Sequence, residues 1–212
     1  MKWQLIASDL DGTLIQTRSS WESIHKALGV WESKGKGYLE MFLAGEIDYN
    51  RFCELDANTW KGTSFSRIIK IAKATRYLSS VKTTVPVLKK AVPYFYIISA
   101  GLQPFADHVA SELDLDGAIA NDLQVENGLL TGKPIINLQW DEKDKVLKKL
   151  CNEKEIDLVA TIAIGDGLAD IPMFEIAGLS IAVNADLPEV IECATYTVEK
   201  FADIPRVIIR AD

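Results

Sequence analysis

Four aspartates follow two apolar segments of the chain, at positions where their carboxylates can meet. Asp9 and Asp11 come directly after the apolar run of residues 3–7. Asp166 and Asp170 follow a second apolar run. Gathering several anions costs free energy unless a cation or a proton offsets their repulsion. Because magnesium prefers carboxylate, carbonyl and water oxygens, the set predicts a Mg2+ site, although one Asp-x-Asp pair alone would be an ordinary polar turn.

Groups that suit a bound anion occur in three further segments. Gly12 follows the first aspartate pair and lets the chain turn tightly. Ser99-Ala100-Gly101 offers a hydroxyl and unhindered backbone N–H groups, which suit phosphate oxygens but also occur in ordinary turns. Lys143 and Lys145 begin a lysine-rich helical pattern, for which a solvated charged face is the usual interpretation. These segments indicate a phosphate site only in combination with the aspartates.

The strands that precede these residues must position them. Continuous apolar runs bounded by polar turns are typical of strands buried on both faces of a parallel sheet. Such runs occupy residues 3–7, 94–98, 160–164 and 179–183. Helical patterns lie between them, one beginning at Pro104 and one around Leu147, and Asn127-Gly128 predicts a β-hairpin. We therefore expect an α/β fold with a doubly wound, Rossmann-like parallel sheet, in which ligands bind beyond the carboxyl ends of the strands.

Residues 16–80 differ from the remainder, because they carry helical patterns and no strand-like run. Ser19-Ser20-Trp21-Glu22 is a capping-box pattern that begins one helix, and Asp48 is placed to cap another. The helix after Asp48 is expected to carry along one side Phe52, Leu55 and Thr59. We predict a helical cap domain over residues 16–80, inserted after the first strand of a core domain of residues 1–15 and 81–212.

Composition excludes several classes of protein. The 212 residues are 48% hydrophobic and 25% charged, which is typical of a soluble globular protein. The net charge of −7 argues against nucleic-acid binding by bulk electrostatics but not against a phosphate substrate, because a divalent cation reverses the local field. The three cysteines share no ligand-like spacing, so reduced thiols in the cytoplasm are expected. No signal-peptide core or bilayer-length apolar stretch is present, so no membrane association is expected, and the oligomeric state stays open.

Taken together, the motifs resemble the haloacid dehalogenase superfamily, and within it the phosphoserine phosphatase-like branch. Its first motif matches Asp9-Leu10-Asp11-Gly12-Thr13, and its second matches Ser99-Ala100-Gly101. The fourth matches Gly165-Asp166-Gly167-Leu168-Ala169-Asp170. An asparagine-containing segment, Ala120-Asn121, and a hairpin ending Gly128-Leu129-Leu130-Thr131-Gly132 stand at suitable spacing. The resemblance implies a phosphatase with Mg2+ as cofactor and a small-molecule phosphate monoester as substrate.

The resemblance also assigns roles to the carboxylates. Asp9 would attack phosphorus and form an aspartyl-phosphate while also binding the metal ion. Asp11 would protonate the leaving oxygen, then activate water, with its backbone carbonyl on the metal. Asp166 would complete the set of metal ligands, and Asp170 would orient a lysine.

Other residues would hold the phosphate. Gly12 and Ser99-Ala100-Gly101 would surround its oxygens, with the Ser99 hydroxyl and the Gly101 N–H as donors. Lys143 fits the spacing of the third-motif lysine, which neutralises charge on the phosphoryl group, and Lys145 is the reserve candidate.

The chain departs from this branch at several positions. Ala169 stands where an asparagine commonly precedes the last aspartate of the fourth motif. The branch uses a glutamate after the first motif for the substrate amine and a cap arginine for its carboxylate. Arg18 and Glu54 stand near these positions, with the charges reversed, and Glu22 and Arg51 lie nearby out of register. Whether Arg18 and Glu54 contact the substrate or are exposed cap charges stays open.

Three other functions share these residues in part. A dehalogenase of the same fold is disfavoured, because displacing a halide needs no proton donor and gives Asp11 no purpose. A phosphomutase needs the same aspartate pair and stays open. A non-catalytic metabolite-binding module is disfavoured, because such proteins usually lose the nucleophile or the metal ligands, and all are present here.

Overall fold

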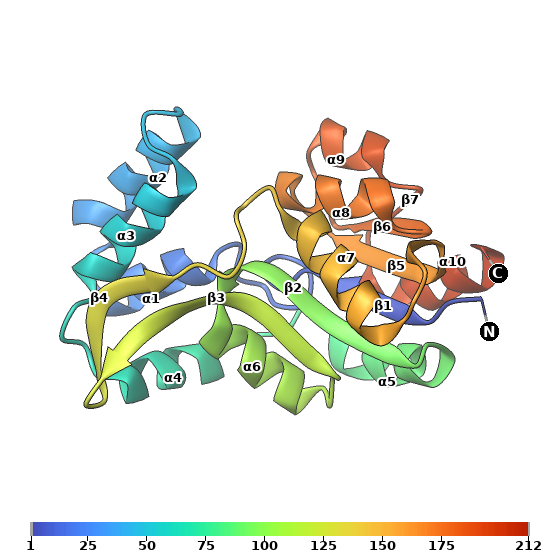
Figure 1. Ribbon diagram of the computed structural model, residues 1–212, viewed down its shortest axis with the longest axis horizontal. Helices are drawn as coiled ribbons and strands as arrows, with labels where there is room; N and C mark the ends of the chain where they lie inside the picture. The colour runs from blue at the N-terminus through green and yellow to red at the C-terminus, as the bar shows by residue number, and fades with distance from the viewer. Residues whose placement is uncertain (1, 212) are drawn as a thin grey trace.

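The four apolar runs form strands of one seven-stranded sheet in the computed structural model, which describes residues 2–211 (Figure 1). The strands are β1 (Leu5–Ser8), β2 (Tyr94–Leu102), β3 (Gly117–Glu126), β4 (Leu129–Ile135), β5 (Thr161–Gly165), β6 (Leu179–Val183) and β7 (Tyr196–Val198). Their order is β4-β3-β2-β1-β5-β6-β7, and every neighbouring pair is parallel except β3 and β4. The chain winds outward from β1 in both directions, so the predicted doubly wound α/β fold is confirmed.

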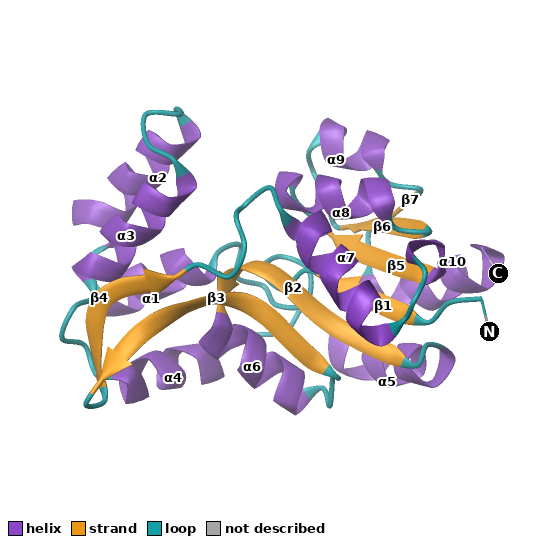
Figure 2. Ribbon diagram, viewed as in Figure 1, coloured by secondary structure: helices purple, strands orange, loops and turns teal. Residues whose placement is uncertain are grey.

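Helices cover both faces of the sheet (Figure 2). On one face lie α5 (Val81–Ala91), α6 (Gln103–Glu112) and α10 (Ile204–Ala211), and on the other lie α7 (Lys143–Lys154), α8 (Ile171–Ile176) and α9 (Pro188–Cys193). Side chains of a strand point alternately to the two faces, so Ile6 joins the core cluster on the first face, and Leu5 and Ala7 join the cluster on the second. Two covered faces explain why β1 has no polar alternation.

The hairpin of β3 and β4 turns at Asn127 and Gly128. Their φ angles are 51° and 77°, and two successive positive values are those of the type I′ turn that matches the twist of paired strands. Strand pairing joins Glu126 to Leu129 across this turn. The predicted hairpin is therefore confirmed.

Four helices lie between β1 and α5, as expected for a helical insertion. They are α1 (Ser20–Leu28), α2 (Lys36–Leu43), α3 (Tyr49–Thr59) and α4 (Phe65–Lys73), with a π-helical segment, Trp31–Gly35, before α2. The Ser19 hydroxyl accepts a hydrogen bond from the Glu22 backbone N–H, and the Asp48 carboxylate accepts one from that of Arg51, which confirms both predicted N-caps. In Figure 1, α1, α2 and α3 gather at the β4 end of the sheet, away from both chain termini. The domain boundaries at residues 16 and 80 stay a prediction.

The buried side of α3 differs from the prediction. Of the expected stripe only Phe52 is buried, and the full buried set is Tyr49, Phe52, Cys53, Asp56 and Ala57. This set follows the spacing of one helix face, whereas Leu55 and Thr59 lie at the margin of that face. The shift rotates Glu54 to the solvent side.

The cysteines and the helix lengths add two findings. Cys53, Cys151 and Cys193 are free thiols, as expected from their spacing. Across residues 2–211, no helix combines the length and the apolar character that crossing a membrane requires.

Candidate active site

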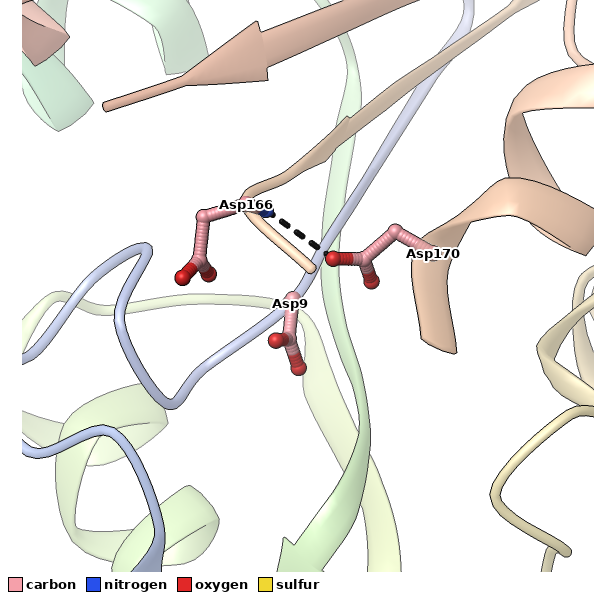
Figure 3. Close-up of side chains that lie close together, drawn as sticks. All are labelled: Asp9, Asp166 and Asp170. Atoms are coloured by element: carbon pink, nitrogen blue, oxygen red, sulfur yellow. Dashed lines mark hydrogen bonds between the residues drawn. The ribbon is translucent and has the colours of Figure 1, made fainter. Parts of the chain in front are cut away.

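Three carboxylates meet at the carboxyl ends of two neighbouring strands. Asp9 directly follows β1, and its backbone N–H donates to the Ile164 carbonyl of β5 at 2.8 Å. Asp166 directly follows β5, and Asp170 ends the short turn beyond it. One carboxylate oxygen of each of the three aspartates lies within 4.8 Å of the others, and Figure 3 shows the three side chains close together. This juxtaposition of Asp9, Asp166 and Asp170 is the one that the strand-end pattern predicts.

A buried lysine joins two of these carboxylates. Lys143, at the start of α7, is 1% exposed, and its Nζ lies 2.8 Å from Asp9 Oδ1 and 2.6 Å from Asp170 Oδ1. Burial acts to lower the pKa of Lys143, but the charges of Asp170 and Asp9 outweigh it and raise that pKa. Lys145 instead is exposed and pairs with Glu142. The structure thus places Lys143, not Lys145, in the site.

Asp170 is held by donors on both of its oxygens. Its Oδ1 accepts from Lys143, and its Oδ2 accepts from the backbone N–H groups of Asp166, at 2.9 Å, and Gly167, at 3.0 Å. The first of these two backbone bonds is the dashed line of Figure 3. Asp170 therefore fixes the direction of the lysine and of the turn that carries Asp166, which agrees with its expected orienting role.

The Asp166 carboxylate is contacted by residues of the segment after β1. The Thr13 hydroxyl donates to Asp166 Oδ1 at 2.5 Å, and Arg18 lies 3.3 Å from Oδ2. Gly12 has a φ of 82°, and a Cβ built on it would lie 2.2 Å from Asp166 Oδ2, so this turn requires glycine for two reasons. Burial, with the charges of Asp9 and Asp170, raises the pKa of Asp166 to about 8.

Asp11 is not part of this cluster, and its two carboxylate oxygens differ in their hydrogen bonds. Its Oδ2 accepts from the Ser20 backbone N–H at 2.9 Å and from the Ser20 hydroxyl at 2.8 Å. Its Oδ1 is buried and has no hydrogen-bond partner within residues 2–211. Burial and the charge of Asp9 raise the pKa of Asp11 to about 7, against the lowering effect of the Ser20 bonds. A fixed carboxyl with one free oxygen and a pKa near neutrality is suited to proton transfer.

The last residues of β2 include the expected anion donors. Ser99 is buried, and its hydroxyl accepts from the Gly101 N–H at 3.0 Å. The Ala100 carbonyl accepts from Trp21 Nε1 at 3.1 Å, from the Tyr49 hydroxyl at 2.6 Å and from Asn121 Nδ2 at 3.2 Å. The carbonyl of Ala100 and the N–H of Gly101 belong to one trans peptide and point in opposite directions. Three donors on the carbonyl therefore fix the direction of the N–H.

The donor set fits a divalent cation. Burial and the charge of Asp170 raise the pKa of Asp9 to about 6 despite the bond to Lys143. The three clustered carboxylates also outnumber the two cations beside them, Lys143 and Arg18. Both oxygens of Asp170 are engaged, so Asp9 and Asp166 are the side chains best placed as ligands. Carboxylate oxygens suit Mg2+. The predicted backbone-carbonyl ligand of Asp11 stays a prediction.

A cleft of about 350 Å³ opens between these residues and the cap. Its lining includes Gly101, Arg18 and Glu22, together with the aspartates and Lys143. Glu54 is absent from it: this side chain lies on the outer side of α3, beside another surface cavity, and pairs with Arg51 at 3.0 Å. Of the two alternatives left open for these residues, Glu54 is an exposed cap charge outside the cleft, whereas Arg18 borders the cleft.

Sequence reasoning assigned no site role to Ser20, Thr13, Tyr49 or Asn121. Ser20 is the first residue of α1, where a backbone N–H is free of helical partners, so its capping-box position was a usable signal. The contact between Tyr49 and Asn121, 2.9 Å long, joins positions 72 residues apart and had no local signal.

Comparisons with known proteins give a consistent result. A family model described as haloacid dehalogenase-like hydrolase matches residues 6–175. A phosphoserine phosphatase of Haemophilus influenzae is 33% identical over 203 residues, which cover 94% of this chain and 63% of that protein. One of Archaeoglobus fulgidus is 32% identical over 185 residues, covering 86% and 53% respectively. The chain thus spans between half and two thirds of the length of these relatives. A solved structure, a phospho-aspartyl intermediate analogue of phosphoserine phosphatase, matches with a TM-score of 0.83 at 28% identity over 99% of both chains.

Proposed function

The chain belongs to the haloacid dehalogenase-like hydrolase family, and we propose that it is a magnesium-dependent phosphatase acting on a small phosphate monoester through an aspartyl-phosphate. One observation carries the proposal: two carboxyls at the end of one strand have different partners. Asp9 is ion-paired with Lys143, whereas Asp11 keeps a free oxygen and a pKa of about 7. Neighbouring carboxyls with different environments mark a division into nucleophile and acid/base.

The first displacement uses both residues. An Asp9 oxygen forms a bond to phosphorus while the bond from phosphorus to the ester oxygen breaks. The departing oxygen takes the proton of Asp11, leaving a free alcohol and an Asp11 carboxylate. Because both Ser20 donors bind Asp11 Oδ2, the proton lies on the other oxygen of Asp11, Oδ1.

The second displacement restores the enzyme. Asp11 removes a proton from water, the water oxygen bonds to phosphorus, and the bond from phosphorus to Asp9 breaks with its electron pair returning to the carboxylate. Inorganic phosphate leaves, and Asp11 is again protonated. Two displacements at one carboxylate need the acid/base residue beside it, as the Asp9-x-Asp11 spacing provides.

The remaining groups bind and orient the phosphate. Lys143 offsets charge on Asp9 and would do so on the phosphoryl oxygens. The Ser99 hydroxyl and the Gly101 N–H, which donates to that hydroxyl in this structure, would donate to those oxygens when phosphate is bound. Asp9, Asp166 and the Asp11 carbonyl are the groups that would hold Mg2+, which supplies positive charge for the phosphoryl oxygens and the nucleophile. The free cysteines favour a reducing compartment such as the cytoplasm.

A dehalogenase remains disfavoured within this family, because Asp11 is built as a proton carrier. The observation applies equally to a phosphomutase, which differs only in the acceptor of the phosphoryl group. Incubation with sugar phosphates, followed by analysis for isomers and for free phosphate, separates the two.

The test is release of phosphate from para-nitrophenyl phosphate with Mg2+ and with a chelator. We expect activity with the metal, loss of activity in Asp9→Asn, and unchanged activity in the control Lys145→Ala, whose side chain is exposed. Binding of fluoroberyllate, a mimic of the aspartyl-phosphate, should also require Asp9. The proposal fails if the folded protein with Mg2+ neither hydrolyses a broad phosphate panel nor binds fluoroberyllate.

A further inference from the structure

Apolar side chains line part of the cleft, beside the aspartates and Lys143. Cap helices supply Leu39, Phe42 and Leu43 from α2 and Phe52 from α3, and the core supplies Trp140 and Leu168. Nothing in the proposed chemistry uses these residues. The alcohol portion of the substrate must lie between the phosphate and the cap. These apolar side chains, which form a wall of the cleft, would therefore contact it.

Phe42 is the centre of the wall. Its ring stacks on that of Phe52 with centroids 5.3 Å apart, and it meets the ring of Trp140 edge to face at 6.1 Å. Trp140 belongs to the segment that leads into α7, so the contact joins the cap to the core. Aromatic packing on two sides holds the Phe42 ring in place and leaves a preformed apolar surface.

Apolar side chains at the mouth of the cleft are open to solvent. Leu43, on the last turn of α2, is 71% exposed, and Leu168, on the core side, is 39% exposed. Both belong to the lining of the same cleft as Phe42. Apolar side chains gathered at one site with a few polar groups are the usual composition of a pocket for an apolar ligand.

The charged groups of the cleft are occupied by one another. Lys143 is bonded to Asp9 and Asp170, and Arg18 lies 3.3 Å from Asp166 and 3.6 Å from Asp186. Within residues 2–211, these are the cations that line the cleft. Glu22, the remaining anion near the cap, is paired with Lys26 at 2.5 Å. An amino-acid substrate would bring an ammonium and a carboxylate against the wall. The ammonium would reach Glu22 only in competition with Lys26, and the carboxylate would reach Arg18 only in competition with Asp166 and Asp186.

We propose that the alcohol portion of the substrate is an uncharged alkyl or aryl group that lies against Phe42, Leu43 and Trp140. This inference rests on the proposed phosphatase function and specifies its substrate class. Burying an ammonium or carboxylate without a partner costs several kcal/mol, whereas burying each methylene gains free energy. The wall therefore selects against phosphorylated amino acids.

The test is a series of straight-chain alkyl phosphates from methyl to hexyl, assayed with Mg2+. Their leaving alkoxides are nearly equal in basicity, so differences in kcat/KM report contact with the wall. We expect kcat/KM to rise with each methylene by up to about fourfold until the cleft is filled. We also expect O-phosphoserine to be at least about tenfold poorer than propyl phosphate, which has the same carbon count.

Matched variants locate the effect. Leu43→Ser and Phe42→Ser should flatten the dependence of kcat/KM on the chain length of the alkyl phosphate. Ile209→Ser is the control, because Ile209 on α10 is 75% exposed and lies outside the cleft. Leu43 and Ile209 are both exposed, so neither substitution should affect folding, and only the first should change the slope.

Binding of alkylphosphonates, which cannot be hydrolysed, separates the two proposals. Affinity that rises with chain length supports the apolar wall even if no ester is cleaved, in which case the phosphatase proposal alone fails. Hydrolysis with a flat chain-length profile, or with O-phosphoserine as the better substrate, overturns the inference and leaves the phosphatase intact. Affinity independent of chain length in the absence of hydrolysis overturns both.

Discussion

Replacing Tyr49 with phenylalanine removes one oxygen atom from the contact between the cap and the phosphate-binding segment. The Tyr49 hydroxyl donates to the Ala100 carbonyl at 2.6 Å and accepts from Asn121 Nδ2 at 2.9 Å. Burial raises the pKa of Tyr49 well above its usual value, so the hydroxyl stays protonated and able to donate. The substitution therefore deletes two buried hydrogen bonds without a change of charge.

The expected loss of stability is small, because the former partners keep other contacts. Trp21 Nε1 still donates to the Ala100 carbonyl, and Asn121 still reaches it at 3.2 Å. Two hydrogen bonds with partly satisfied partners amount to about 1–2 kcal/mol of unfolding free energy. The turnover number should also fall, because the Ala100 carbonyl fixes the direction of the Gly101 N–H. Removing a donor to a developing anion costs about 10²–10³ in rate, and loosening one should cost roughly three- to tenfold in kcat.

The assay combines urea unfolding with kcat and KM for para-nitrophenyl phosphate. Tyr38→Phe is the matched control, since Tyr38 on α2 is half-buried and its hydroxyl has no hydrogen-bond partner within residues 2–211. We expect Tyr49→Phe to lower kcat more than it raises KM. If stability falls by the stated amount and kcat is unchanged, Tyr49 is a packing residue and the inferred control of the Gly101 N–H is refuted.

Three further predictions concern the site itself. Lys143→Met leaves two buried carboxylates without their shared cation, so kcat should fall by about 10²–10³. The unfolding free energy of the metal-free protein should fall by about 3–5 kcal/mol. The control Lys145→Met should change that free energy by less than about 0.5 kcal/mol in the same assays. Gly101→Ala should lower kcat at least about a hundredfold with a stability loss of about 1–3 kcal/mol by urea unfolding, because its Cβ would lie 2.5 Å from Asp11 Oδ2; full activity would contradict the close packing. The raised pKa of Asp166, about 8 against an ordinary 3.8, means that folding favours its protonated form, so the metal-free protein should lose stability as pH rises through that interval. Mg2+ should then raise the melting temperature more at pH 8 than at pH 5, and Asp166→Asn should remove most of that difference.

The sheet and the reacting carboxylates could be predicted because their signals are local. An apolar run such as residues 3–7 can be buried on both faces only within a covered sheet, and an aspartate directly after it must lie at the strand end. The same reasoning predicts the positions of Asp9 and Asp166, whereas Lys143 is indicated only by the spacing of the motif that the chain resembles. Their meeting point follows from the parallel arrangement of β1 and β5, because the carboxyl ends of neighbouring parallel strands share one edge of the sheet.

The cap could be predicted only as a set of helices, because the direction of its side chains depends on how the helices pack. Counting residues from the first motif put Glu54 at the substrate, yet the buried face of α3 is centred on Tyr49, Phe52 and Cys53. Glu54 lies on the opposite side of that helix and pairs with Arg51. Residue spacing taken from a resemblance does not predict which side of a cap helix a residue lies on. Irregular segments such as the π-helical Trp31–Gly35 also have no recognisable sequence pattern.

A cap residue, Ser20, orients the acid/base carboxyl of Asp11, and its hydroxyl also lies close to Gly101. The Ser20 hydroxyl, at the start of α1, donates to Asp11 and accepts from the Leu102 N–H at 2.9 Å. A Cβ on Gly101 would lie 2.4 Å from that hydroxyl. Glycine is therefore required here by the cap residue that orients the acid/base carboxyl as well as by any phosphate bound at its N–H. Since Phe42 belongs to the same cap as Ser20, a change of the apolar wall that shifts the cap would also move the proton-carrying oxygen of Asp11. Cap substitutions should therefore be judged by kcat as well as by KM.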